Sequence, residues 1–212
     1  MFLNSGRSYA ALPDFARDKD FGLDGLVCGN GSYIVHGGEV IFRVRIPDEV
    51  LRAIVPLYED NETWCVFEGE TANYALRYGP SNNIEIHSAR ELLTVYAPVL
   101  ITKLTGGGVA DENAHKVLEQ WFWICQQKSY YEAMIKGCSK ASGIDRVIAL
   151  LGVPLENAVA IGDSGNDADM LRHAGRGVAM GNATQAALDA ADEITADCRN
   201  GGVAEAIYKY IE

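Results

Sequence analysis

Positive charge is scarce in this sequence of 212 residues. Lys and Arg number 18 against 29 Asp and Glu, which leaves a formal net charge of -11. A negative field of this size repels nucleic acid and anionic membrane surfaces, so the sequence predicts neither as a partner. An anionic ligand such as a phosphate ester would need a metal ion or a local group of cationic side chains.

Long apolar runs and paired cysteines are also missing. No apolar segment approaches the roughly 20 residues that span a bilayer, and the first residues lack the apolar core of a signal peptide. The five cysteines are odd in number and scattered, without Cys-x-x-Cys spacing or a neighbouring histidine pair. We therefore expect reduced thiols and a cytoplasmic location.

The apolar pattern changes along the chain, which predicts two parts to the fold. After residue 139, helical stretches alternate with short apolar strands, the pattern of a parallel sheet with helices on both faces. Residues 45–131 instead mix helices with alternating strands and include a Gly-Gly-Gly segment, predicted to be a loop, at 106–108. The prediction is an α/β fold, with a core of residues 1–44 and 132–212 interrupted by an α+β insert at 45–131.

The segment Ala-Ile-Gly-Asp-Ser-Gly-Asn-Asp-Ala-Asp-Met, residues 160–170, places three carboxylates directly after an apolar run. Parallel sheets bind ligands beyond the carboxyl ends of their strands, which is where Asp163 would lie. Carboxylate oxygens suit Mg²⁺, and Asp163 and Asp167 could supply one direct and one water-bridged contact. The alternative is that both residues only cap the positive N-terminus of the following helix.

Three polar residues elsewhere have both a functional and a structural interpretation. Ser5, which precedes a helix predicted over about residues 8–20, could cradle a phosphate or simply cap that helix. Lys140 would begin a helix, where a cation opposes the helix dipole, unless it is only solvated. Asn30 could orient a site group, although Asn-Gly is first of all a turn signal.

These motifs stand in an order that resembles the haloacid dehalogenase (HAD) superfamily. The matching segments are Asn4–Arg7, Asn30–Gly31, Gly137–Lys140, Gly162–Asp167 and Val178–Ala183. They are most similar to its Cof-type sugar-phosphatase branch, which carries a large α/β cap where this chain has its insert. The resemblance implies a Rossmann-like parallel-sheet core with an inserted α+β cap domain. It also implies a Mg²⁺-dependent phosphatase of small phosphorylated metabolites, such as sugar phosphates, that works through an aspartyl-phosphate.

The resemblance further implies a role for each candidate residue. Ser5 would hydrogen-bond the transferring phosphoryl group, and Lys140 would offset the charge on its oxygens. Asp163 would bind Mg²⁺ directly, and Asp167 would support the metal through water. The substrate-binding candidates are Arg7, Asn30 and Asn166.

The sequence departs from the family in one motif. Family members begin with an apolar strand that ends in Asp-x-Asp-Gly-Thr, in which the first Asp is the nucleophile and the second is the general acid and base. The 212 residues contain no such segment. We therefore expect the first strand of the core to be missing and phosphatase activity to be negligible. Either the neighbouring strands would close the gap, or elements would be exchanged with a second copy in a homo-oligomer.

Two other functions remain open on the sequence alone. The chain could be a non-catalytic protein that binds a phosphate ligand or regulates a partner. A Rossmann-type nucleotide binder is disfavoured, because no Gly-x-Gly-x-x-Gly follows the first strand.

Overall fold

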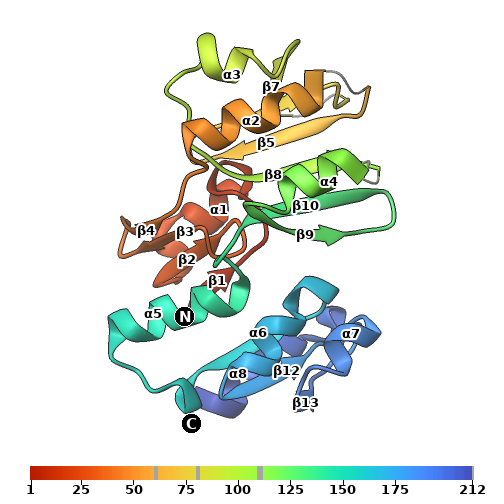
Figure 1. The fold of residues 1–212 in the computed structure, drawn as a ribbon. Coiled ribbons are helices and arrows are strands. Elements are labelled where there is room, and N and C mark those ends of the chain that lie inside the picture. The colour runs from red at the N-terminus through yellow and green to blue at the C-terminus, as the bar shows by residue number, and fades with distance from the viewer. Residues whose placement is uncertain (60–61, 80–81, 109–111, 212) are drawn as a thin grey trace. The chain divides into compact units, whose positions relative to one another are not determined.

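The computed structural model describes residues 1–59, 62–79, 82–108 and 112–211 (Figure 1). The chain forms two compact units, Met1–Cys138 and Ser139–Glu212. In the described residues, no helix is both long enough and apolar enough to cross a membrane.

The first unit begins with a four-stranded sheet in the order β1-β2-β3-β4. Its strands are β1 (Phe2–Asn4), β2 (Gly25–Cys28), β3 (Tyr33–His36) and β4 (Glu39–Arg43). β1 and β2 run parallel, and the other pairs are antiparallel. Among the described residues, β1 pairs with β2 alone, so it is the outer strand of its sheet.

The single helix predicted over residues 8–20 is wrong. The segment forms three short pieces, η1 (Tyr9–Ala11), α1 (Asp14–Arg17) and η2 (Lys19–Phe21). Pro13 explains the interruption, because it lacks a backbone N–H and disfavours helical backbone at the preceding residue. Leu12 is accordingly extended, with ψ of 142°.

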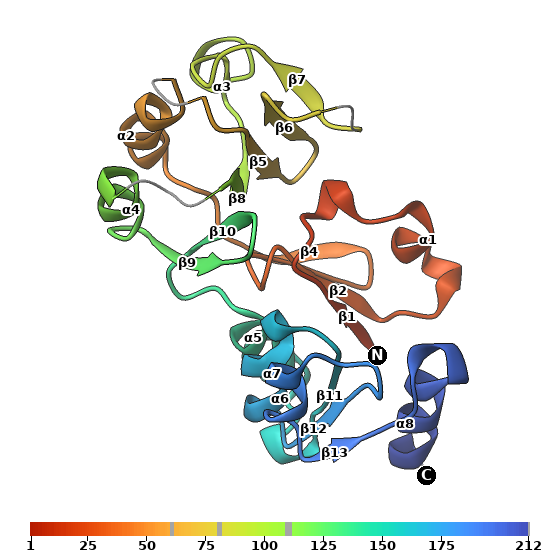
Figure 2. The same ribbon diagram turned by 90° about the vertical axis from the view of Figure 1, so that its right-hand side faces the viewer.

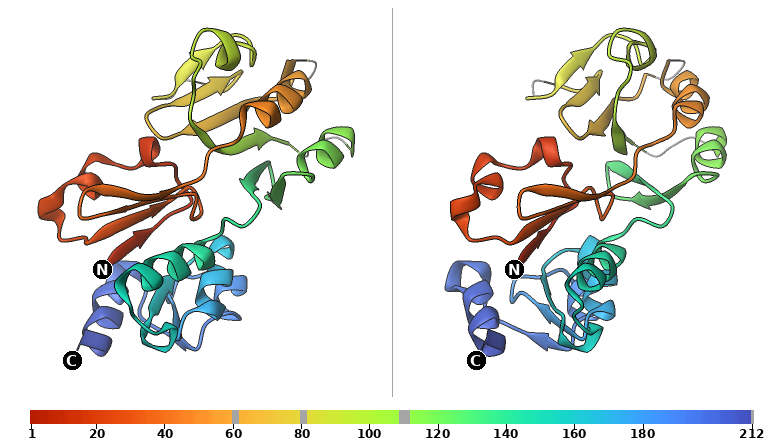
Figure 3. Two further views of the ribbon diagram at one scale, coloured as in Figure 1. Left: turned by 60° about the vertical axis from the view of Figure 1, so that its left-hand side comes forward. Right: turned by 90° about the vertical axis from the view of Figure 1, so that its left-hand side faces the viewer.

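A second sheet of the first unit has six strands in the order β7-β6-β5-β8-β10-β9. Its strands are β5 (Cys65–Gly69), β6 (Asn73–Leu76), β7 (Ile84–Ile86), β8 (Ile101–Gly107), β9 (Phe122–Gln126) and β10 (Tyr130–Ile135). The helices of this part are α2 (Asp48–Glu59), α3 (Glu91–Thr94) and α4 (Glu112–Leu118). Figures 2 and 3 show α2 and α4 on one face of this sheet, with the four-stranded sheet on the other side.

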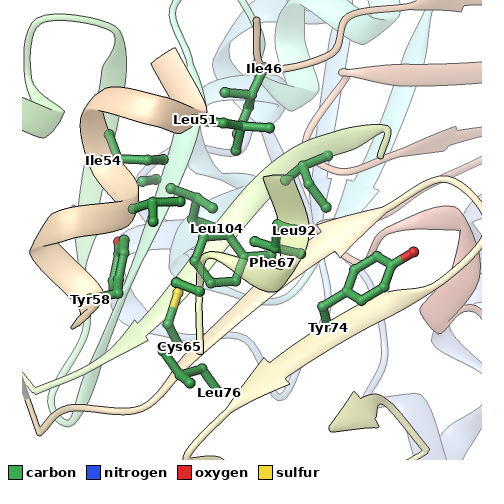
Figure 4. Close-up of a cluster of buried hydrophobic side chains, with 14 of the residues drawn as sticks. Ile46, Leu51, Ile54, Tyr58, Cys65, Phe67, Tyr74, Leu76, Leu92 and Leu104 are labelled. Carbon is green, nitrogen blue, oxygen red and sulfur yellow. The ribbon is translucent and has the colours of Figure 1, made fainter. Parts of the chain in front are cut away.

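The main hydrophobic core lies between α2 and the six-stranded sheet (Figure 4). Leu51, Ile54 and Tyr58 follow each other at helical spacing along α2 and are all buried. They pack with Phe67 of β5 and Leu104 of β8, which are fully buried. Complete burial of a Leu, Ile or Phe side chain contributes about 1.5–3 kcal/mol to the stability of the fold.

β8 runs through the glycine segment that the sequence predicts to be a loop. Gly106 and Gly107 are buried strand residues that both pair with β10, and Gly106 also pairs with Cys65 of β5. A Cβ at Gly106 would lie 2.4 Å from the ring of Tyr131, and one at Gly107 would lie 2.3 Å from the ring of Trp64. Glycine is therefore needed because aromatic rings cover these positions, and it does not end the strand.

The second unit is a three-stranded parallel sheet, β11-β12-β13, with helices on both sides (Figure 2). Its strands and main helices are α5 (Lys140–Leu151), β11 (Val159–Gly162), α6 (Ala168–His173), β12 (Arg176–Ala179), α7 (Gln185–Leu188), β13 (Glu193–Ile194) and α8 (Gly202–Ile211). Short 3₁₀ turns occur as η3 (Leu155–Asn157), η4 (Gly165–Asp167) and η5 (Cys198–Asn200). The predicted α/β class with a parallel sheet is confirmed.

Candidate active site

Asp163 stands directly after β11, with its side chain exposed at the carboxyl end of the strand. The loop after β12 lies beside it, because the amide of Thr184 donates to the Asp163 carbonyl at 2.8 Å and that of Met180 donates to the Gly162 carbonyl at 2.9 Å. Gly162 is required here, since a Cβ would meet the Cβ of Asp167 at 2.6 Å. The end of β11, the turn η4 and the loop after β12 thus pack together at the carboxyl end of the parallel sheet.

Asp167 closes the turn that follows β11 and is 4% exposed. Its Oδ2 accepts the amide protons of Asp163 at 3.0 Å and Ser164 at 2.9 Å, and the Ser164 hydroxyl at 2.8 Å. Its Oδ1 accepts from the Lys140 ammonium. Asp167 therefore caps the turn, as the capping interpretation predicts. The same carboxylate also forms a buried ion pair, which that interpretation does not include.

Lys140 is the first residue of α5, and Ser139 caps that helix by accepting the amide proton of Ser142. The lysine is 7% exposed, so the interpretation as a solvated surface lysine is wrong. Its Nζ lies 3.5 Å from Oδ1 of Asn166, in addition to its bond to Asp167. The fold thus holds a buried cation and Asn166 against the turn that begins at Asp163.

The Lys140 ammonium and the Ser164 donors determine the charge state of Asp167. Burial by itself would raise the pKa of this carboxyl group, but these partners lower the pKa below its ordinary value of 3.8. A carboxyl group whose pKa is lower in the folded protein stabilises the fold at pH values above its pKa in the unfolded chain. That stabilisation is lost as the pH falls through its pKa in the folded protein.

We expect this linkage to be visible in an Asp167→Asn variant. The difference in unfolding free energy between the two proteins should stay constant from pH 7 to 5. It should shrink at pH values below about 4, where the unfolded wild-type chain takes up a proton on this carboxylate more readily than the folded protein does. Urea titrations at a series of pH values measure this difference, and the other carboxylates cancel from it. A difference that stays constant down to pH 2 would contradict the assigned ion pair.

Ser5, Arg7 and Asn30 come together in the first unit. Ser5 follows β1, and its amide donates to the Val27 carbonyl at 2.7 Å. Its carbonyl accepts from the Asn30 amide at 3.2 Å, and its hydroxyl accepts from the Arg7 amide at 3.1 Å. Asn30 is buried, with φ of 53° between two glycines of positive φ, so the turn interpretation holds. The Arg7 side chain is exposed.

The donor set of the second unit fits a magnesium ion with few protein ligands. No group of three or more His, Cys, Asp or Glu side chains that could hold a metal is found in the described part of the chain. Mg²⁺ commonly keeps several waters and takes only one or two carboxylates together with phosphate oxygens. Asp163 offers an exposed carboxylate for this purpose, whereas Asp167 is engaged by Lys140 and Ser164.

Ser164 belongs to the candidate site but is not among the residues that the sequence predicts for it. Its hydroxyl lies within hydrogen-bond distance of both Asp167 and Asn166, so it links the two side chains that contact Lys140. A usable signal was present, because Ser164 and Asp167 have the Ser-x-x-acid spacing that is typical of a reciprocally bonded helix start.

Comparison with known proteins agrees with these motifs. The family model of haloacid dehalogenase-like hydrolases matches residues 1–207. YkrA of Bacillus subtilis (strain 168) is 24% identical, over 98% of this chain and 82% of its own length. Phosphatase YwpJ of the same organism is 30% identical over 61% of this chain, but the match spans only 47% of YwpJ.

Solved structures resemble the chain over almost its whole length. The HAD subclass IIB sugar phosphatase BT4131 matches with a TM-score of 0.76 and 27% identity, over 99% of this chain and 84% of that one. BT1666, a phosphatase from Bacteroides thetaiotaomicron, gives a TM-score of 0.82 over 99% of this chain and 81% of that one; at 24% identity this supports the fold alone. With the family model covering residues 1–207, the chain belongs to the haloacid dehalogenase-like hydrolases.

Proposed function

We propose that the chain provides most of the active site of a Mg²⁺-dependent phosphatase that acts on small phosphorylated metabolites, with sugar phosphates as the substrate class. The observation that carries the proposal is the buried Lys140–Asp167 pair beside the exposed Asp163 at the end of a parallel strand. The similarity to YwpJ, a phosphatase, and to BT4131, a sugar phosphatase, supports it.

Each residue has a chemical task in this proposal. Asp163 would hold the metal, which when bound would neutralise charge on phosphate oxygens. Asp167 keeps the Lys140 ammonium fixed, and Lys140 would stabilise the charge of a phosphoryl group without having to reorganise. The Ser5 hydroxyl would orient that phosphoryl group. Arg7, Asn30 and Asn166 would help to bind it through their amide or guanidinium donors.

The remaining parts of the proposal concern the whole protein. Residues 45–131 would act as the cap that selects the substrate, although β10 of their sheet continues to Ile135. The five free thiols support a reducing, cytoplasmic environment. β11 has only β12 as a neighbour in the described residues, and an outer strand of this kind can pair with a second copy, which supports a homo-oligomer.

Ligand binding tests the proposal directly. Isothermal calorimetry with inorganic orthophosphate should give measurable heat in the presence of Mg²⁺, and Asp163→Asn should weaken the binding by about tenfold or more, the loss expected for a charged contact. Asp189→Asn is the matched control, because this carboxylate lies on the surface at the end of α7 and contacts Gln185. Equal affinities for the wild type and Asp163→Asn would refute the metal assignment.

A non-catalytic role in binding a phosphate ligand or regulating a partner is the second candidate. It is favoured by the absence of an Asp-x-Asp-Gly-Thr segment from the 212 residues. Both candidates require phosphate binding, so hydrolysis distinguishes them.

A further inference from the structure

A second buried group of charges lies on the six-stranded sheet, in the first unit. Glu68 of β5, Lys103 of β8 and Glu132 of β10 are 7%, 3% and 9% exposed. Glu68 and Lys103 stand opposite each other in neighbouring strands, and the Lys103 Nζ lies 3.2 Å from Oε1 of Glu68 and also pairs with Glu132. Buried charges are costly unless they are paired, so this arrangement calls for an explanation.

The group faces away from the helices that cover the sheet. Phe67, Leu104 and Ala133, which alternate with the charged residues along the same three strands, belong to the core beneath α2. Successive strand residues point to opposite faces, so Glu68, Lys103 and Glu132 lie on the other face. The four-stranded sheet lies on that side (Figure 2).

The charged group holds the segment after β1. Lys103 Nζ donates to the Gly6 carbonyl at 2.9 Å, and the Ser8 amide donates to Oε2 of Glu68 at 3.3 Å. The Ser8 hydroxyl donates to Oδ1 of Asn73 at 2.8 Å. Ser5 and Arg7 are held from the other side by the turn after β2, through the amides of Asn30 and Gly29. The segment is therefore fixed between two sheets.

Lys103 stays charged in this position. Burial by itself would lower the pKa of the ammonium group, but the carboxylates of Glu68 and Glu132 raise the pKa above its usual value. An ammonium group has three protons, and the three acceptors are the Gly6 carbonyl and the two carboxylates. All three protons have acceptors within the protein, so Lys103 has no further donor to offer a ligand, and we assign it the task of holding the segment in place.

We propose that Lys103 is a positioning residue for the proposed phosphate site: through the Gly6 carbonyl it sets the place of the Ser5 hydroxyl and the Arg7 amide. The six-stranded sheet is thereby coupled to ligand affinity without any contact to the ligand. The proposal rests on the proposed function for its consequence, but its structural claim can be tested without a ligand.

Amide hydrogen exchange measured by NMR tests that claim. The variant is the triple substitution Lys103→Met, Glu68→Gln and Glu132→Gln, which leaves no unpaired buried charge. Exchange of the Gly29 and Asn30 amides should accelerate by about tenfold or more, the scale of one lost charge-assisted hydrogen bond, while the β2–β3 ladder is unchanged. Thr105→Val is the matched control, because Thr105 donates to Glu68 at 2.5 Å, whereas the hydrogen bonds described above to the segment come from Lys103, Glu68 and Asn73. This control variant should leave the exchange rates of the Gly29 and Asn30 amides unchanged.

Two outcomes would overturn the proposal: exchange at Gly29 and Asn30 that stays at the wild-type rate, or exchange that rises equally there and throughout the β2–β3 ladder. If the triple variant does not fold, Glu68→Gln alone should give the same local acceleration to a smaller degree, and its absence counts against the proposal.

Calorimetry then separates this proposal from the proposed function. With Mg²⁺ present, orthophosphate affinity should fall in the triple variant, because a loosened segment must be ordered when the ligand binds, but it should not fall in Thr105→Val. If the wild-type protein binds no orthophosphate, the proposed function fails, whereas the exchange data still decide the role of Lys103. Unchanged affinity despite faster exchange would overturn the coupling to the ligand.

Discussion

Phosphate release by the 212-residue polypeptide should be indistinguishable from the buffer blank on a panel of sugar phosphates with Mg²⁺. The chain contains the residues proposed to bind the phosphoryl group, but its 212 residues contain no Asp-x-Asp-Gly-Thr segment to supply a nucleophile. Joining an upstream segment, consisting of an apolar strand that ends in this motif and the helix that follows it, ahead of Met1 should raise turnover by about a thousandfold or more, because loss of a nucleophile slows enzymes on at least that scale. A malachite-green assay measures the release.

Two control proteins make this result interpretable. In the first control, the first Asp of the joined Asp-x-Asp-Gly-Thr motif is replaced by Asn, and in the second the joined chain carries Asp163→Ala. Phosphate release by both should fall to that of the buffer blank. Clear turnover by residues 1–212 alone, abolished by Asp163→Ala, would overturn the predicted inactivity. Tight orthophosphate binding with no turnover in the joined chain would instead favour the non-catalytic function.

Lys140→Met should lower the free energy of unfolding by about 3–5 kcal/mol, because it leaves the Asp167 carboxylate buried without its cation. Asp167 is 4% exposed, so water would replace the lost cation poorly. Adding Asp167→Asn should recover part of the loss, since the double variant carries no unpaired buried charge. Urea denaturation followed by circular dichroism measures these free energies.

Lys116→Met is the matched control for this prediction. Lys116 also forms an ion pair, with Glu112 at 2.7 Å, but its side chain is 66% exposed. Exposed pairs contribute about 0–1 kcal/mol, so this variant should lose little. If Lys140→Met loses no more than Lys116→Met, the lysine does not stabilise the turn after β11, and its placement as a fixed cation is incorrect.

Local patterns were sufficient to predict most elements around the candidate site. The Gly-Asp-Ser-Gly-Asn-Asp segment was placed after an apolar strand, and the structure ends β11 at Gly162. The helix that begins near Lys140 runs to Leu151, as its apolar spacing indicates. Both features depend on residues within a few positions of each other, where spacing and capping are decisive.

Patterns failed where distant residues determine the local structure. Gly106 and Gly107 were taken for a loop, but rings from Tyr131 and Trp64 make glycine the only residue that fits in that strand. β7 and β8 were missed for the related reason that strands are stabilised by their neighbours. The helix over residues 8–20 was predicted across Pro13, whose effect is local and could have been anticipated.

The sequence by itself determined the family and the order of its motifs, because these depend on residue identity and spacing along the chain. Only the tertiary structure decided that Lys140 is buried against Asp167, 27 residues away. The same holds for Lys103, which pairs with Glu68 and Glu132 and donates to the Gly6 carbonyl. Such pairings arise when remote segments pack and exclude water, so that a charge must find its counter-charge. Spacing along a chain carries no record of that process.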